Sequence, residues 1–306
     1  MMPAILFPGQ GTQNDIRSTE LAAADRDAAK LYELVADQTG LDLLSLRSDQ
    51  LQSTHAAQLA IVTFSLAIWQ IWRKVYPDVS VGAFAGFSLG EYTALAASGI
   101  LQVPDLITLL ARRAEFMQEA VNTTPGGMTA LIGLDIVRIR QILAEERWAD
   151  RVWIANENAP GQTVIAGYQT DLALCAETMR KAGARRIIPL DVQGAFHTPL
   201  MRPAAEKLRQ TARSFVFREP GTSVYLNLTA EPANPSTDWP RTLAGQMCSP
   251  IRWTDEVCRM QRDGIRQFCE LGPGQVLTGL VRRILPDAGK YSFSSLADLE
   301  QRLPSG

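Results

Sequence analysis

The stretch GFSLG, residues 86–90, constrains the fold of this chain more than any other feature. It separates an apolar run, VGAFA, from an amphipathic run, EYTALAASG, which predicts a strand at about 79–85, a tight turn, and a helix that ends at Gly99. A G-x-S-x-G turn places a serine on a sharp strand-to-helix elbow with its hydroxyl exposed, near the positive end of the helix. The same five residues also fit an ordinary glycine-bounded turn, so Ser88 is either a nucleophile or a turn residue.

A nucleophilic serine needs a base, and the chain contains only two histidines. His55 lies in QSTHAAQ, at an expected helix start, where a structural role is the better interpretation. His197 lies in VQGAFHTPLM, between a glycine and a proline. Although a lone histidine is more often structural, the choice of two favours His197 as the partner of Ser88.

Arg112 and Arg113 are neighbours on an expected helix over 103–121. Adjacent helical residues point about 100° apart, so one of the two is expected to face inward. An inward guanidinium needs a carboxylate, which a substrate could supply in a bidentate pair. A surface cation or an internal ion pair explains the same residues equally well.

Two patterns along the chain predict an α/β protein of two units. AILF (4–7) is a strand candidate that runs into the loop PGQGTQ, and residues 56–74 predict a long buried helix. From 127 the order is strand, helix, two strands around PGQ, helix and strand, which is the ferredoxin-like arrangement. We therefore expect a large domain of residues 1–125 and 194–306, with a small domain inserted at 126–193.

The remaining chain predicts fewer elements. We expect a helix at 199–214, a proline-rich loop near 230–240, a strand at 265–270 and a helix over VLTGLVRRIL.

Composition excludes several classes of function. The formal net charge is −2, so no nucleic-acid partner is expected. The longest apolar stretch begins at Leu59 and falls short of the ~20 residues of a membrane span, and no signal peptide is evident, so we expect a cytoplasmic protein without a membrane partner. The four cysteines lack CxxC spacing, so neither a metal site nor a disulfide framework is expected.

Several motifs, in order along nearly the whole chain, resemble those of the malonyl-CoA:acyl-carrier-protein acyltransferases of fatty-acid and polyketide synthesis. They are FPGQGTQ (7–13), Gln58 in HAAQLA, GFSLGEYTAL (86–95), ARRAEFMQEAV (111–121), GGM (126–128), GAFH (194–197) and ELGPGQVLTGL (270–280). The resemblance implies an α/β-hydrolase-like large domain with an inserted ferredoxin-like domain.

The resemblance also implies roles for particular residues. Ser88 matches the nucleophile and His197 the base, and the family orients this histidine through a backbone carbonyl, here that of Gln246, rather than through an acid. Arg113 matches the arginine that binds the free carboxylate of malonyl.

Five further positions are placed at the acyl group by the resemblance. The backbone N–H groups of Gln10 and Leu89 match the oxyanion hole, and Gln58 lines the pocket. Phe196 resembles the residue that narrows the pocket of malonyl-selective members against an added methyl group. The family commonly has a histidine before the nucleophile, where this chain has Phe87, which cannot donate a hydrogen bond.

The activity implied is a ping-pong transfer through a malonyl-serine ester, from malonyl-CoA to the phosphopantetheine thiol of an acyl carrier protein. No metal or redox cofactor is implied, CoA thioester being a substrate, and a monomer is expected.

Alternatives to this activity remain. One is a hydrolase that clears acyl groups from carrier proteins, although such editing enzymes typically lack the arginine matched here by Arg113. Others are a transferase for a different extender unit and a silent carrier-protein docking module, which the presence of both Ser88 and His197 disfavours. The sequence leaves open whether the chain serves fatty-acid or polyketide synthesis.

Overall fold

The computed structural model describes residues 2–47, 49–192 and 194–300. The strands are β1 (Ala4–Phe7), β2 (Ala83–Gly86), β3 (Gly126–Ile132), β4 (Val152–Ala159), β5 (Gln162–Tyr168), β6 (Arg186–Pro189), β7 (Gln267–Leu271) and β8 (Gly289–Phe293). The helices are α1 (Ser18–Ala24), α2 (Arg26–Thr39), α3 (Thr54–Val75), α4 (Leu89–Ala97), α5 (Val103–Thr123), α6 (Ile136–Leu143), α7 (Gln169–Lys181), α8 (Arg202–Ala212), α9 (Trp239–Met247), α10 (Trp253–Arg262), α11 (Val276–Ile284) and α12 (Leu296–Leu299). Short 3-10 turns lie at Gln13–Asp15, Gln50–Gln52, Glu146–Trp148 and Pro199–Met201.

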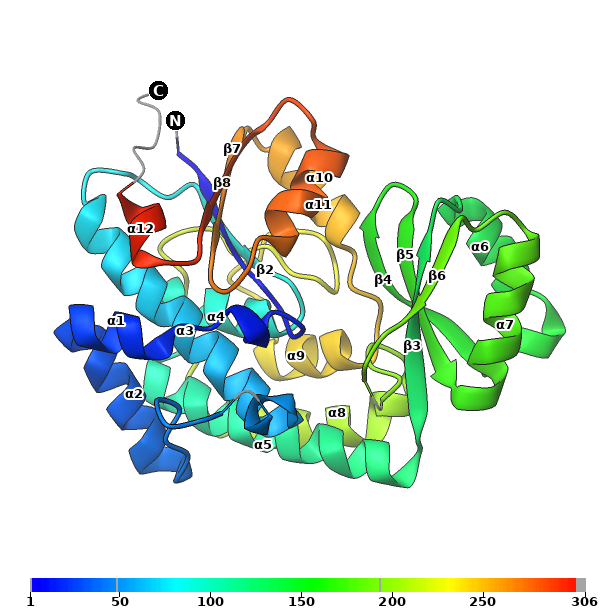
Figure 1. The fold of residues 1–306 in the computed structure, drawn as a ribbon, viewed down its shortest axis with the longest axis horizontal. Coiled ribbons are helices and arrows are strands. Elements are labelled where there is room, and N and C mark those ends of the chain that lie inside the picture. Colours follow the sequence, from blue (N-terminus) through cyan, green and yellow to red (C-terminus); the bar gives the residue numbers. More distant parts are fainter. Residues whose placement is uncertain (1, 48, 193, 301–306) are drawn as a thin grey trace.

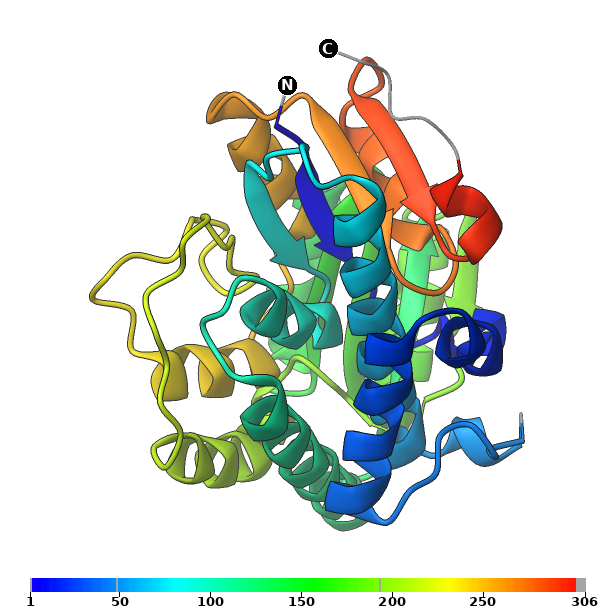
Figure 2. The ribbon, with the colours of Figure 1, turned by 90° about the vertical axis from the view of Figure 1, so that its left-hand side faces the viewer.

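A parallel sheet with the order β2-β1-β7-β8 organises the larger part of the molecule (Figure 2). All four residues of β1 are fully buried, because helices pack on both faces of the sheet. A strand buried on both faces is a continuous apolar run rather than an alternating one, which is what AILF shows. The predicted strand 4–7 is confirmed, whereas the strand predicted at about 79–85 begins later, at Ala83, and ends at Gly86.

The long helix α3 is the central core helix of this part. Ser53 caps its N-terminus by accepting a hydrogen bond from Ala56 N at 3.2 Å, and the 22 residues contain no glycine or proline. By length and composition α3 could cross a membrane, but 78% of its most apolar window is buried inside the structure, as in a core helix. The predicted buried helix over 56–74 is confirmed.

A second sheet, antiparallel, has the order β4-β5-β3-β6 and stands apart from the first, with α6 and α7 on its outer face (Figure 1). The residues under the two helices are large and apolar, whereas those on the opposite face, such as Met128, Ala130 and Ala166, are mostly small. The inner face therefore leaves room for the segment that carries Phe196, which packs against it. The strand and helix order predicted from 127 onward is confirmed.

Two backbone hydrogen bonds link the second sheet to the rest of the chain. Ile251 N donates to Ala155 O and Glu157 N donates to Ile251 O, both at 2.9 Å, so β4 is tied to the segment that precedes α10. This contact fixes one wall of the space between the two sheets.

The C-terminal half departs from the sequence-based expectation in the bounds of one helix and in elements that were not predicted. The helix expected at 199–214 begins as a 3-10 turn at Pro199–Met201 and ends at Ala212. Helices α9 and α10 and strand β8 are not anticipated, because each is short and only partly apolar. Position 193, where the inserted unit was expected to end, lies outside the described residues, as do residues 1 and 301–306 of the expected large domain.

Candidate active site

Ser88 lies on a sharp turn between a strand and a helix, the elbow that the sequence predicts. Ser88 has φ 52° and ψ −102°, a conformation that non-glycine residues rarely adopt, between the end of β2 and the start of α4. A Cβ on Gly86 would lie 1.9 Å from Gly90 C, and a Cβ on Gly90 would lie 2.0 Å from Phe7 O. Both positions therefore require glycine, and the spacing of the motif follows from how closely α4 approaches β1 and β2.

His197 lies within hydrogen-bonding distance of the serine. Its Nε2 is 2.7 Å from Ser88 Oγ, and its Nδ1 is 2.9 Å from the backbone carbonyl oxygen of Gln246. A carbonyl oxygen only accepts, so Nδ1 carries the hydrogen in this arrangement and Nε2 can accept from the serine hydroxyl. His55, the other histidine, lies in the first turn of α3.

Burial controls the charge of this histidine. His197 is almost fully buried, and desolvation, with a smaller contribution from nearby Arg113, lowers its pKa to about 4, while the hydrogen bond to Gln246 acts in the opposite direction. The imidazole is therefore neutral at pH 7, which is the state a general base needs.

Arg113 is the inward member of the arginine pair. It is 2% exposed, its Nη1 donates to Gln58 Oε1 at 2.7 Å, and its guanidinium lies 4.9 Å from the centroid of the Tyr92 ring. Its Nε has no hydrogen-bond partner, and no carboxylate of the described residues forms an ion pair with it. Arg112 is exposed and pairs with Glu115 at 2.9 Å. A buried cation with no carboxylate in direct contact favours the binding of an anion beside it.

A cavity of about 380 Å³ connects these groups. The residues that line it are Gln10, Gly11, Gln13, Asn14, Phe87, Ser88, Leu89, Arg113, Met117, Met128, Asn156, Leu190, Asp191, Val192, Phe196 and His197. They come from the loop after β1, the elbow, α5, the inner face of the second sheet and the segment around 190–197. Of the sequence-predicted residues, Gln10, Phe87, Leu89 and Phe196 all lie on its wall.

The structure corrects the expectation that Gln58 lines the pocket. Gln58 is fully buried behind Arg113 and is not among the residues on the cavity wall. Its Nε2 lies 3.5 Å from Met117 Sδ while its oxygen holds the guanidinium. Gln58, on α3, thus contacts two cavity-lining residues of α5, Arg113 and Met117, without lining the cavity itself.

Phe87 has an aromatic partner that the sequence did not suggest. Its ring lies 5.6 Å from that of Trp253 at 67°, an edge-to-face contact, so the residue before the serine is part of an apolar wall.

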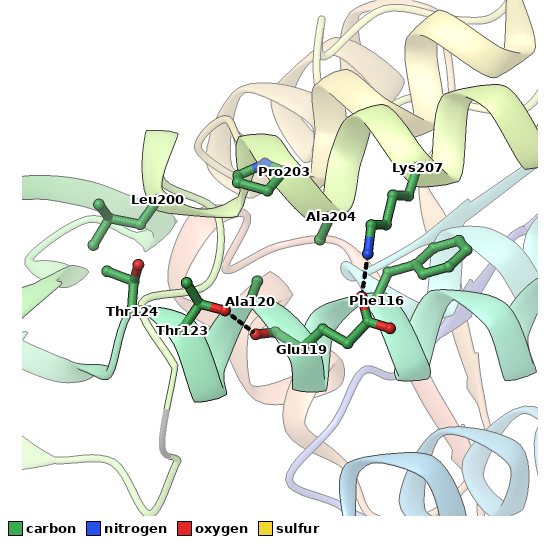
Figure 3. A pocket seen from close by; sticks show the side chains of 9 residues that line it. All are labelled: Phe116, Glu119, Ala120, Thr123, Thr124, Leu200, Pro203, Ala204 and Lys207. Atoms are coloured by element: carbon green, nitrogen blue, oxygen red, sulfur yellow. Dashed lines mark hydrogen bonds and ion pairs between the residues drawn. The ribbon is translucent and has the colours of Figure 1, made fainter.

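A second hollow, of about 510 Å³, also reaches His197, but neither Ser88 nor Arg113 lines it. Figure 3 shows a groove of about 100 Å³ between α5 and α8, where Lys207 reaches across to the carboxylate of Glu119. Among the described residues no cluster of three or more His, Cys, Asp or Glu side chains could hold a metal ion, and the four cysteines are unpaired.

Sequence reasoning missed the polar groups beneath the elbow. Asn227, Glu91 and Glu256 are fully buried, and Asn227 is hydrogen-bonded to both carboxyl groups and to Ser88 N. Glu91 lies in the motif GFSLGEYTAL, where a glutamate inside an otherwise buried helix was an available signal. Asn227, in the stretch YLNLTA, gave no such signal in the sequence.

Comparison with known proteins places the chain among acyl-transferring enzymes. Residues 5–299 match the model of a family described as the acyl transferase domain. The malonyl CoA-acyl carrier protein transacylase of Haemophilus influenzae is 36% identical over 298 residues, which are 96% of each chain, and that of Bacillus subtilis is 36% identical over 92% of this chain and 90% of its own.

Solved structures agree with these relatives. A type II PKS acyl-carrier protein in complex with its malonyl-transacylase matches with a TM-score of 0.93 at 33% identity, covering 98% of both chains. An acyl carrier protein S-malonyltransferase from Vibrio cholerae matches with a TM-score of 0.93 at 32% identity, covering 98% of this chain and 99% of its own.

Proposed function

This chain belongs to the acyl transferase domain family, and we propose from that premise that it transfers a malonyl group from CoA to the phosphopantetheine thiol of an acyl carrier protein. The names of its relatives contain both malonyl CoA and acyl carrier protein, which supports these two as its substrates. The observation that carries the proposal is the buried guanidinium of Arg113, which lines the same cavity as Ser88 and His197 and lacks a carboxylate partner among the described residues. Malonyl-CoA supplies both a carboxylate for Arg113 and a thioester for Ser88.

In the first half-reaction Ser88 Oγ attacks the thioester carbonyl carbon of malonyl-CoA. His197 Nε2, at 2.7 Å, takes the hydroxyl proton, and the oxygen that becomes negative is stabilised by the backbone N–H groups of Gln10 and Leu89. The C–S bond then breaks, CoA leaves as the thiol with the proton returned by His197, and a malonyl-serine ester remains. Gln246 stabilises the transient imidazolium through its backbone carbonyl.

The second half-reaction uses the same groups in reverse. The phosphopantetheine thiol loses its proton to His197 and attacks the ester carbonyl, the same N–H groups stabilise the oxyanion, and Ser88 leaves with the proton. Every step is balanced by proton transfer through one histidine, so the proposal requires neither a metal ion nor a redox cofactor.

Selection of the acyl group is assigned to residues on the cavity wall. Arg113 favours acyl groups with a free carboxylate, because a buried cation is costly to leave unpaired. Phe196 limits the width of the cavity near His197, and Phe87, held against Trp253, supplies an apolar surface beside the serine. We assign the chain to malonyl rather than to a bulkier extender unit on these grounds.

The fold is assigned in finer terms on the same premise. We propose an α/β-hydrolase-like large domain, residues 1–125 and 194–306, with a ferredoxin-like domain inserted at 126–193, in a monomeric enzyme. The order β4-β5-β3-β6 with α6 and α7 on one face supports the inserted unit, and the parallel order β2-β1-β7-β8 around the elbow supports the large one.

The decisive experiment is intact-protein mass spectrometry after brief mixing with malonyl-CoA, methylmalonyl-CoA or acetyl-CoA. We expect a malonyl adduct that forms fastest, that is absent in Ser88→Ala, and that is discharged by a phosphopantetheinylated carrier protein. Discharge by water as fast as by the carrier protein would instead indicate a hydrolase, and a faster methylmalonyl adduct would indicate another extender unit. No adduct from a folded protein would overturn the proposal.

A further inference from the structure

Ser88 and His197, the dyad of nucleophile and base, are both held in unusual backbone conformations. Ser88 has φ 52° and His197 has φ 60°, in the left-handed region that side chains with a Cβ rarely adopt. Such conformations persist only where the surroundings fix them, so groups other than the dyad must hold the two residues in place.

The side chain of Asn227 spans the elbow. Its Oδ1 accepts a hydrogen bond from Ser88 N at 2.8 Å, and its Nδ2 donates to the carbonyl oxygen of Gly86, also at 2.8 Å. Asn227 comes from the loop before α9, far from the elbow in sequence, and is fully buried. One amide group thus fixes the peptide groups on both sides of Phe87, and with them the direction in which Ser88 leaves the strand.

Gln246 ties the serine to the histidine. Its Nε2 donates to the carbonyl oxygen of Ser88 at 2.9 Å, while its own backbone carbonyl oxygen lies 2.9 Å from His197 Nδ1. A single residue of α9 therefore sets the position of both reacting side chains relative to each other.

Two buried carboxyl groups accept hydrogen bonds from Asn227. Glu91 Oε2 accepts from Asn227 N at 2.6 Å, and Glu256 Oε2 accepts from Asn227 Nδ2 at 2.8 Å. Desolvation raises the pKa of Glu91 to about 7, and desolvation together with the neighbouring Glu91 raises the pKa of Glu256 well above its ordinary value. Burying two carboxyl groups here costs free energy. This cost argues that their hydrogen bonds to Asn227 do more than pack a loop.

Neither amide residue lines the cavity, so neither contacts the acyl group. We propose that Asn227 and Gln246 are positioning residues, whose side-chain amides hold the nucleophile elbow and the Ser88–His197 pair in the geometry that the chemical step requires. The inference rests on the proposed function for the identity of the reaction, but the positioning role applies to any reaction of Ser88.

The sharpest variant is Gln246→Met. It keeps the backbone carbonyl that contacts His197 and nearly the same volume, and it removes the Nε2 donor to Ser88. It also removes the 3.3 Å hydrogen bond that Nε2 donates to Asn227 Oδ1, and Gln246 Oε1, a buried oxygen without a hydrogen-bond partner. Asn227→Ser is the second variant, and Leu243→Met, a buried change on the same helix α9, is the matched control.

We would measure kcat and KM for malonyl-CoA, thermal unfolding, and the rate at which phenylmethanesulfonyl fluoride labels Ser88, read by intact mass. For Gln246→Met we expect kcat and the labelling rate to fall about 10- to 100-fold, as small misplacements of reacting groups do, with KM within about twofold. The melting temperature should stay close to that of Leu243→Met, which should react like the wild type.

Three outcomes overturn the proposal: unchanged kcat and labelling in Gln246→Met, a rise in KM alone, or a loss of activity that merely follows a loss of thermal stability absent from Leu243→Met. The labelling assay separates this proposal from the proposed function, because it needs no CoA. A wild type that labels normally yet takes no malonyl group would overturn the function, and slower labelling of Gln246→Met would still support the positioning role.

Discussion

Gln58 Oε1 accepts a hydrogen bond from Arg113 Nη1 at 2.7 Å, so the buried guanidinium is oriented by a neutral amide instead of by an acid. An amide fixes the direction of the cation without cancelling its charge. The charge is then available to a substrate carboxylate in the cavity.

Replacing Arg113 by Ala should impair acylation by malonyl-CoA and spare acylation by acetyl-CoA. Loss of one partner of a buried charged pair costs about 2 kcal/mol or more, which corresponds to a fall of at least about 30-fold in the malonyl rate. Adduct formation followed by intact mass measures both donors. Arg112→Ala, which removes the exposed neighbour paired with Glu115, is the control and should behave as the wild type. Equal losses for both donors would contradict a carboxylate-binding role.

Replacing Gln58 by Glu should inhibit the enzyme from within. The new carboxylate would occupy the place of Oε1, pair with Arg113 and compete with the malonyl carboxylate, so we expect malonyl acylation to fall and acetyl acylation to change little. Because a buried ion pair adds little net stability, thermal unfolding should stay near the wild type. Gln118→Glu, an exposed change on α5, is the matched control. A wild-type malonyl rate in Gln58→Glu would be evidence against the role of Arg113.

Replacing Phe196 by Ser should widen the cavity and relax the choice of acyl group. One methyl group in an apolar pocket is worth about 1 to 3 kcal/mol, so the ratio of methylmalonyl to malonyl acylation should rise about tenfold or more. Competition between the two donors, resolved by adduct mass, measures this ratio. Phe116→Ser, which alters the groove of Figure 3 and not the cavity, should leave the ratio unchanged.

The rate of acylation should depend on pH through His197. Its pKa is lowered from 6.5 to about 4, and only the neutral ring can accept the serine proton. The rate should therefore be constant between about pH 6 and 8 and fall as the pH drops through about 4 and the ring becomes protonated. The acylation rate can be measured by quenched mixing with malonyl-CoA in buffers over this pH range. A midpoint of the rate profile near pH 7 would show that burial does not set the pKa of the ring.

Replacing Gly90 by Ala should unfold the elbow. The added Cβ would lie 2.0 Å from the backbone oxygen of Phe7, so α4 would have to separate from β1, and we expect a loss of at least about 4 kcal/mol in the free energy of unfolding. Denaturant titration measures this change in the free energy of unfolding. Gly279→Ala in α11 has no atom within 4 Å of the new Cβ, and should leave stability unchanged or raise it by about 0.5 to 1 kcal/mol. Equal effects of the two substitutions would exclude the steric explanation.

Local patterns in the sequence were enough to predict the elements that hold the cavity. The buried run AILF, the apolar helix α3, the glycine-flanked Ser88 and the strand and helix order of β3 to β6 can each be read from contiguous stretches of sequence, because periodicity and turn chemistry are local properties. The scarcity of histidine left one good partner for Ser88, and helical geometry required one of two adjacent arginines to face inward.

Only the tertiary structure decided how these groups meet. It showed that Arg113 rather than Arg112 lacks a carboxylate, that Gln58 lies behind it instead of on the cavity wall, and that Asn227, Gln246 and Glu256 come from three later segments to hold the elbow. Such contacts join residues separated by tens to more than a hundred positions, and no local pattern carries them. They arise because a buried polar group must find its hydrogen-bond partner wherever the packed chain brings one.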